Sequence, residues 1–72
     1  MTRTATIAVT VNGEQRDMPA GLTLAGLLTH LELDPRKVAV ERNLEIAPRS
    51  AYGDIAIADG DRLEIVQFVG GG

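Results

Sequence analysis

The chain has 72 residues, enough for one domain whose small core buries about 60% of the surface of the unfolded chain. Its composition, 44% hydrophobic and 24% charged, is typical of a folded protein and not of a disordered one. The net charge of −3 argues against nucleic acid or an acidic membrane surface as a partner, and the absence of cysteine excludes disulfides, cysteine-bound zinc and thiol nucleophiles.

The first part of the chain has the pattern of a β-hairpin. Apolar side chains occupy alternate positions of residues 5–11, which predicts a half-buried strand. Asn12-Gly13 follows, and this dipeptide suits a tight hairpin turn. A second, weaker strand is expected at about residues 14–18, and the break at residues 19–21 ends it.

The next segment predicts the main helix. Its apolar residues recur with the spacing of one helix face: Leu24, Leu27, Leu28 and Leu31. Thr23 is placed to cap the N-terminus, and Gly26 weakens the helix by about 1 kcal/mol relative to alanine. We expect the helix to end near residues 32–34, because Pro35 restricts the residue before it.

Shorter elements fill the second half of the chain. Residues 38–40 predict a third strand, 43–45 a turn, and 46–48 a short edge strand whose proline needs no ladder donor. A turn at residues 59–61 then leads into a final strand at about 62–68. Residues 50–58 have no clear periodicity, although Tyr52 and Ile55 are candidates to pin a turn onto the core.

The order of these elements predicts the fold class. A strand–helix–strand crossover places parallel strands in one sheet. We therefore expect an α+β fold of the β-grasp type, with a mixed four- to five-stranded sheet and one main helix packed on one face. The domain would span residues 1–68, and residues 69–72 would form a flexible C-terminal glycine tail.

The tail suggests a chemistry. Glycine has no Cβ, so Gly70-Gly71-Gly72 could thread a narrow channel in another protein. A terminal carboxylate is ionised at neutral pH and could attack the α-phosphate of ATP. If this chain carries sulfur, it has no thiol to hold a persulfide, so a thiocarboxylate on Gly72 is the remaining route. The alternative interpretation is an inert, frayed terminus.

The last strand also predicts a docking surface. If Leu63 and Ile65 face the core, alternation turns Glu64, Val66 and Phe68 outward. An exposed aromatic side chain next to a reactive tail indicates a contact surface, unless Phe68 folds back onto the sheet edge. The candidate partner-binding residues are Gly71, Gly70, Val69, Phe68 and Val66.

No catalytic or metal-binding group is expected. His30, the single histidine, falls off the leucine stripe and has no nucleophile beside it. Asp54, Asp59 and Asp61 lack the spacing of a calcium loop. No glycine-rich loop precedes a helix, so a partner must bind the ATP. We expect a protein that is not an enzyme and needs no cofactor.

These residues together resemble the ThiS family, the ubiquitin-like β-grasp sulfur carriers of bacterial thiamin biosynthesis. The matching segments are Val11-Asn12-Gly13-Glu14, Thr23 with the four helix leucines, Val38-Ala39-Val40-Glu41 followed by Asn43, Pro48-Arg49, Asp59-Gly60-Asp61, and residues 64–72. The family requires a Gly-Gly ending, which corresponds to Gly71 and Gly72, with Gly70 as an extra glycine.

The resemblance implies three protein partners. An E1-like adenylyltransferase of the ThiF type would adenylate Gly72. A cysteine-fed sulfur-transfer enzyme would convert the adenylate to a thiocarboxylate, and a thiazole synthase of the ThiG type would accept the sulfur. The carrier itself would be a recycled co-substrate, and a cytoplasmic location is expected because the sequence shows neither an export signal nor a membrane span.

Several alternatives remain open. The small subunit of molybdopterin synthase is similar in fold and ending, and so are β-grasp sulfur carriers for other acceptors. A plain binding module with an inert tail, or a modifier joined to lysines through Gly72, would also fit the pattern.

Overall fold

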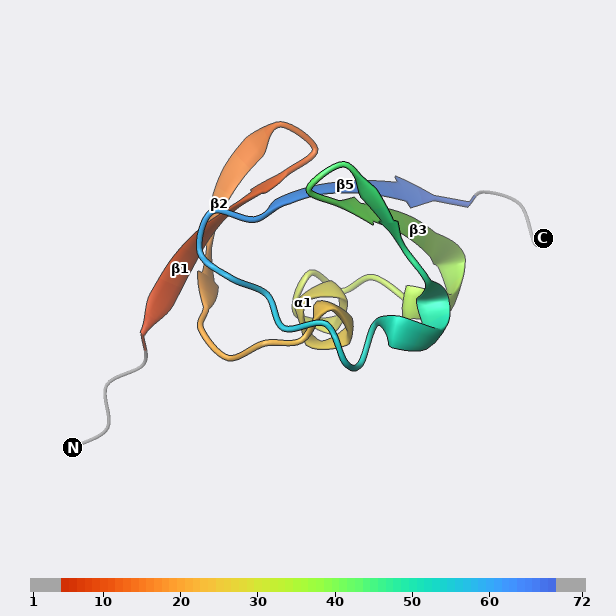
Figure 1. Cartoon of the computed structure of the whole chain (residues 1–72), viewed down its shortest axis with the longest axis horizontal. Helices are drawn as coiled ribbons and strands as arrows, with labels where there is room; N and C mark the ends of the chain where they lie inside the picture. The colour runs from red at the N-terminus through yellow and green to blue at the C-terminus, as the bar shows by residue number, and fades with distance from the viewer. Residues whose placement is uncertain (1–4, 69–72) are drawn as a thin grey trace.

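The computed structural model describes residues 5–68 of the chain (Figure 1). Its elements, in chain order, are β1 (Thr6–Val11), β2 (Glu14–Pro19), α1 (Leu24–His30), η1 (Pro35–Lys37), β3 (Val38–Arg42), β4 (Glu45–Ala47), η2 (Arg49–Ala51) and β5 (Arg62–Gln67). No helix described between residues 5 and 68 combines the length and the apolar character needed to cross a membrane.

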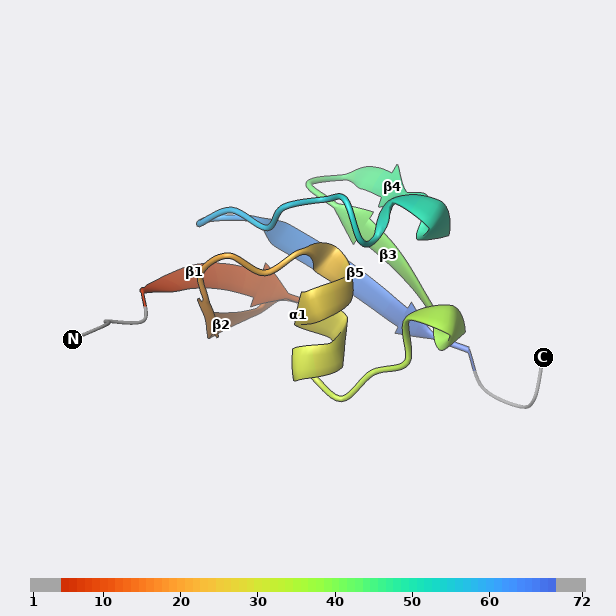
Figure 2. The same ribbon diagram turned by 90° about the horizontal axis from the view of Figure 1, so that it is seen from below.

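The five strands form one mixed sheet in the order β2-β1-β5-β3-β4. β5 is the central strand, parallel to β1 and antiparallel to β3. The sheet curves over α1, which crosses one of its faces (Figures 1 and 2). This arrangement confirms the predicted α+β, ubiquitin-like β-grasp fold. Within residues 5–68, no element covers the other face of the sheet (Figures 1 and 2).

The core lies between α1 and the inner face of the sheet. Three of the four predicted helix leucines are fully buried: Leu24, Leu27 and Leu28. They pack with inward-facing strand residues, among which Val9, Val38 and Leu63 are almost completely inaccessible. Thr23 caps the helix as predicted, because its Oγ1 accepts a hydrogen bond from the Gly26 N–H at 3.1 Å.

The helix ends earlier than the sequence predicts. It stops at His30, and Glu32 adopts a left-handed φ of 61°. The Glu32 N–H then donates to the Thr29 carbonyl and the Leu33 N–H donates to the Leu28 carbonyl, both at 2.9 Å. These two bonds form a Schellman motif. The prediction missed this end because the motif here uses glutamate where glycine is usual.

The β3–β4 turn is also one residue shorter than the predicted turn at residues 43–45. Only Asn43 and Leu44 form it, with φ of 51° and 72°, as in a two-residue type I′ turn. Glu45 therefore belongs to β4, and Pro48 lies after it. The predicted edge position of this short strand is confirmed.

The segment after β4 pins itself to the core through one aromatic side chain. Tyr52 is buried, as suggested from the sequence, and its hydroxyl donates to the Val38 carbonyl at 3.3 Å. Ile55 is only partly buried, whereas Ile57, which no sequence pattern indicated, is buried.

Candidate functional site: the open face and the last strand

β5 separates its side chains between the two faces of the sheet as predicted. Leu63 is fully buried and Ile65 is 8% exposed, whereas Val66 and Phe68 are 61% and 55% exposed. Phe68 lies just beyond the end of β5, and its N–H donates to the Lys37 carbonyl at 2.9 Å. The other candidate site residues, Val69, Gly70, Gly71 and Gly72, lie outside the described residues.

Phe68 does not enter the core. The guanidinium carbon of Arg49 lies 5.9 Å from the centroid of the Phe68 ring. Arg49 is itself tied to the body, because its Nη2 donates to the Val38 carbonyl at 3.2 Å. A cation–π contact at an exposed site contributes about 0.5–1 kcal/mol. Arg49 therefore supports an aromatic side chain that stays half exposed where β5 leaves the sheet.

Two further exposed apolar residues were not predicted from the sequence. Leu44 is 83% exposed and Ile46 is 80% exposed, the highest values among the large apolar residues of the described chain. Alternation offered a signal for one of them: Ala47 is buried in β4, so its neighbour Ile46 must point to the other face. Leu44 lies at the tip of the β3–β4 turn, where no periodicity predicts a side-chain direction.

Ile46 borders a shallow groove on the open face. Val66 is paired with Ala39 across β3 and β5, and Ile46 is paired with Glu41 across β3 and β4. The groove has a volume of about 180 Å³ and is lined by Ala39, Val40, Glu41, Ile46, Glu64 and Val66. We call this surface, together with Phe68, the open-face strip.

Two carboxylates lie in the middle of the open-face strip. Glu41 and Glu64 are directly opposite one another in the register of β3 and β5, and both are exposed. Within residues 5–68 neither takes part in an ion pair. Like charges directly opposite in antiparallel strands are destabilising. The strip therefore presents two carboxylates between apolar side chains.

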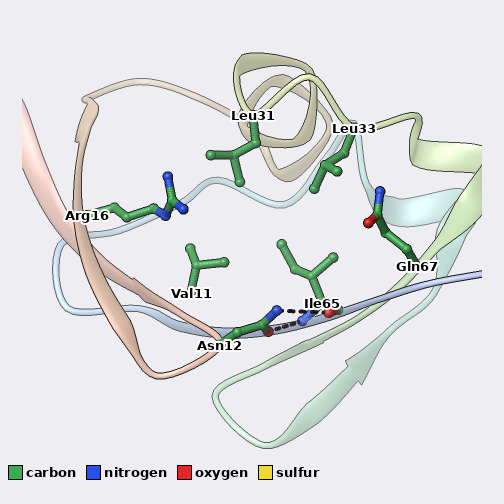
Figure 3. Close-up of a pocket in the computed structure, with 7 residues that line it drawn as sticks. All are labelled: Val11, Asn12, Arg16, Leu31, Leu33, Ile65 and Gln67. Carbon is green, nitrogen blue, oxygen red and sulfur yellow. Dashed lines mark hydrogen bonds between the residues drawn. The ribbon is translucent and has the colours of Figure 1, made fainter.

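Asn12 holds β5 from the side of β1. The regular pairing of β1 with β5 ends at Val11 and Leu63. Beyond it, the Asn12 side chain accepts from the Ile65 N–H at 2.7 Å and donates to the Ile65 carbonyl at 3.0 Å (Figure 3). The side-chain amide of Asn12 thus makes the two hydrogen bonds to β5 that the main chain of one further residue of β1 would otherwise make. The sequence predicted Asn12 only as a turn residue.

The start of β5 is anchored by a buried carboxylate. Asp61, 5% exposed, accepts hydrogen bonds from Arg42 Nε at 2.9 Å, Asn43 Nδ2 at 3.1 Å and the Ala58 N–H at 2.9 Å. Burial alone would raise the pKa of this carboxyl, but the hydrogen bonds from Ala58, Arg42 and Asn43 outweigh burial and hold the pKa below its ordinary value. The predicted turn at residues 59–61 therefore also holds the start of β5 through the ion pair between Asp61 and Arg42.

The neighbouring acidic residue has a similar structural role. Asp59 Oδ1 accepts from the Ala8 N–H at 2.8 Å. No group of three possible metal ligands occurs among residues 5–68. Asp59 and Asp61 both accept hydrogen bonds from main-chain N–H groups, which gives each of them a structural role.

A second pocket lies on the helix side of the sheet, with a volume of about 220 Å³ (Figure 3). Its lining residues are Val11, Asn12, Arg16, Leu31, Leu33, Ile65 and Gln67. The Asn12 amide is already bonded to Ile65, and Arg16 pairs with Glu14 at 3.3 Å. Most of the remaining lining is aliphatic, so this pocket lacks polar groups that converge on a ligand.

Comparisons with known proteins relate this chain to the ThiS family. The model of the ThiS family matches residues 9–72. The sulfur carrier protein ThiS of Bacillus subtilis is 44% identical over 50 residues, which are 69% of this chain and 76% of that protein. The crystal structure of the thiamine biosynthesis protein ThiS from Geobacter metallireducens aligns with a TM-score of 0.75 and 34% identity, covering 92% of this chain and 100% of that one.

The chain also matches part of a larger protein. A thiazole synthase of Paramagnetospirillum magneticum is 58% identical over 62 residues, which are 86% of this chain. The matched segment is only 19% of that protein, so the chain spans about a fifth of the length of this relative.

Proposed function

The chain belongs to the ThiS family, and on that premise we propose that it is a sulfur carrier of thiamin biosynthesis whose working group is the carboxyl of Gly72. In this role it is a co-substrate and not an enzyme. The work is done by cytoplasmic partners that bind the body and act on the terminal residue.

One structural observation carries this proposal. The strand that leads toward Gly72 is the central strand of the sheet, held by β1 and Asn12 on one side and by β3 on the other. Phe68 is the last described residue, and four further residues can reach at most about 14 Å when fully extended. A central strand held on both sides, followed by a short glycine-rich segment, suits the delivery of a main-chain carboxyl into the active site of an enzyme.

The chemistry needs two steps at that carboxyl. A Gly72 carboxylate oxygen attacks the α-phosphorus of ATP, and pyrophosphate leaves. A sulfide-equivalent nucleophile from a cysteine-fed sulfur-transfer enzyme then attacks the acyl carbon, and AMP leaves with the former carboxylate oxygen. The product is a thiocarboxylate, and the chain needs no thiol of its own.

We assign the first step to an E1-like adenylyltransferase of the ThiF type and the use of the sulfur to a thiazole synthase of the ThiG type. Family membership supports both assignments. The likeness to a segment of a protein named thiazole synthase supports the second, because it associates this domain with that enzyme. On each partner, Val66 and Phe68 would contact the enzyme while residues 69–72 enter its active site.

Intact-mass measurement tests the proposal. Incubation with ATP, the adenylyltransferase and a sulfur source should add the mass difference between sulfur and oxygen. No change would indicate an inert binding module, and a product joined to other proteins would indicate a modifier. A natural protein that continues uncleaved past residue 72 would also contradict the proposal, because Gly72 would then have no free carboxyl.

Two variants connect the mass change to Gly72. Deletion of Gly72, or a tag fused after it, should abolish the gain of sulfur while the melting temperature stays that of the parent chain. The matched control is a tag of the same length at the N-terminus, which should leave the gain intact. Sulfur loading of the C-terminally tagged form would exclude the Gly72 carboxyl as the site.

A further inference from the structure

We propose that Arg49 is a positioning residue that sets the direction in which the chain leaves β5 toward Gly72. It acts through Phe68, the last of the described residues. The inference rests on the proposed function, because this direction matters only if the terminal carboxyl has to enter an enzyme. It gives a role to a side chain that lies outside the open-face strip and takes no part in the chemistry.

Arg49 joins segments that are distant in the sequence. It begins η2, and its Nη2 donates to the Val38 carbonyl at 3.2 Å. Val38 begins β3 and lies opposite Gln67, the last residue of β5, in the pairing register. The guanidinium carbon of Arg49 lies 5.9 Å from the centroid of the Phe68 ring. One side chain thus bridges the start of β3 and the residue that follows β5.

The body of the domain holds this guanidinium in place. The Val38 carbonyl that accepts from Arg49 also accepts from the hydroxyl of the buried Tyr52, at 3.3 Å. Within residues 5–68 no carboxylate forms an ion pair with Arg49, so none draws it away from the ring. A guanidinium is planar and carries five N–H donors, so one hydrogen bond at its edge leaves its face free for an aromatic ring. Arg49 is therefore a fixed support for Phe68.

Two contacts orient the Cα atom of Phe68. Its N–H donates to the Lys37 carbonyl at 2.9 Å, which fixes the Cα–N bond relative to β3. The contact of the ring with Arg49 favours one χ1 rotamer and so fixes the Cα–Cβ bond. Because Cα is tetrahedral and of one handedness, these two bonds determine the direction of the third, which leads to the carbonyl carbon and on toward Gly72.

Phe68 is the last aromatic position from which a side chain can set this direction. Only Val69 and three glycines follow, and glycine has no Cβ and a wide range of backbone conformations. Without Arg49 the ring would sample other rotamers, and more of the bound carriers would present the carboxyl away from ATP. Correct orientation of a reacting group raises the rate even when the group that provides it does not touch the reacting atoms.

The first test uses the carrier alone. Three-bond NMR couplings across χ1 of Phe68 should report one predominant rotamer in the parent chain and a rotamer average in Arg49→Ala. Tyr52→Phe is the matched control, because it removes the other hydrogen bond to the Val38 carbonyl and leaves Arg49 beside the ring. It should keep the parent couplings even where its melting temperature is lower. Averaged couplings in the parent, or unchanged couplings in Arg49→Ala, would overturn the inference.

The second test follows adenylation through pyrophosphate release. Arg49→Ala should lower kcat about two- to fivefold, the range expected for loss of one exposed cation–π contact, while KM for the carrier stays near that of the parent. Arg49→Lys should recover part of kcat, because an ammonium group also attracts the ring. Tyr52→Phe should keep the parent kcat. An equal fall in Tyr52→Phe would show that stability around Val38 controls the rate, against the inference.

A double-mutant cycle decides whether Arg49 acts through Phe68. Adding Arg49→Ala to Phe68→Ala should cause no further fall in kcat, because the ring is already absent. An equal fall in both backgrounds, or a rise in KM with kcat unchanged, would mean that Arg49 touches the enzyme itself and would overturn the inference. A parent chain that is not adenylated would remove the proposed function, and the Phe68 couplings would still decide whether Arg49 fixes the ring.

Discussion

Three polar side chains act here where main-chain pairing ends. Asn12 pairs with Ile65 beyond the end of β1, and Asn43 Oδ1 accepts from the Arg62 N–H at 2.9 Å as β5 begins. Asp61 fastens the same corner through Arg42. Asn43 and Asp61 fix the start of β5 and Asn12 holds its middle, so the strand that leads to the proposed working group is secured by individual residues as well as by the sheet.

Asp61→Asn should lower the free energy of unfolding by about 2–3 kcal/mol, because it leaves the partly buried Arg42 without its counter-charge. The measurement is urea unfolding at neutral pH. Asp59→Asn is the control, since an amide oxygen can still accept the single bond from the Ala8 N–H. Equal costs in the two variants would show that the ion pair contributes nothing specific.

The same variant should change the pH dependence. The pKa of Asp61 is held low in the folded state, so its contribution is present above the pKa of the unfolded chain and is lost as the pH falls. The side-chain hydrogen bond from Arg36 likewise lowers the pKa of Asp34 to about 2. The parent chain should lose stability from about pH 5 downward, and Asp61→Asn should lose less. Parallel curves for the two proteins would contradict this assignment.

At the scale of elements, the two hairpin turns have the same form but were not equally predictable. Asn12-Gly13 is the dipeptide most typical of a type I′ turn, and it lies where expected, with φ of 50° and 83°. Asn43-Leu44 has the same backbone form with an atypical second residue, so the predicted turn was one residue too long. Local chemistry identifies a turn only when the residues at its positive-φ positions are the favoured ones.

The same limit applies to the helix and to the site. The leucine spacing identified α1 and its buried face, but Glu32 gives no sign that it takes a left-handed conformation. Alternation along β5 correctly separated Leu63 from Val66. The Asp61 anchor and the glutamate pair could not be predicted, because each depends on the pairing register of strands far apart in the sequence.

Substitutions at Asn12 separate its role in the turn from its two side-chain hydrogen bonds to Ile65. Asn12→Gly keeps a residue suited to positive φ but removes both side-chain hydrogen bonds, and should lower the free energy of unfolding by about 1–3 kcal/mol. Asn12→Ala should cost about 1 kcal/mol more, because alanine is disfavoured at positive φ. Thermal or urea unfolding measures both values. Parent-like stability of Asn12→Gly would show that the two hydrogen bonds to Ile65 do not contribute to stability.

At the scale of the whole molecule, α1 and the sheet enclose the core of the described residues, 5–68. The core is continuous from Val9 and Met18 at one side of the sheet to Ala47 at the other. Tyr52, the only tyrosine, lies in this cluster and bonds to β3. A chain of this size has a free energy of unfolding of about 4–11 kcal/mol, so we expect the parts to unfold together.

Leu63→Ala tests this cooperativity from the central strand. Truncating a fully buried leucine should cost about 2–5 kcal/mol. Tyrosine fluorescence and far-UV circular dichroism should then move to the same lower midpoint in urea. Midpoints that separate in the variant would mean that the Tyr52 side of the sheet holds together without β5.

The central place of β5 has a mechanical consequence. An enzyme that engages the residues after Phe68 pulls on a strand with neighbours on both sides, β1 parallel and β3 antiparallel. Tension along that strand stretches its rungs to β3 together, in shear, because those bonds run across the direction of the force. An edge strand pulled outward would instead peel away one bond at a time. The fold therefore lets a partner exert tension on the chain beyond β5 while the sheet resists unfolding.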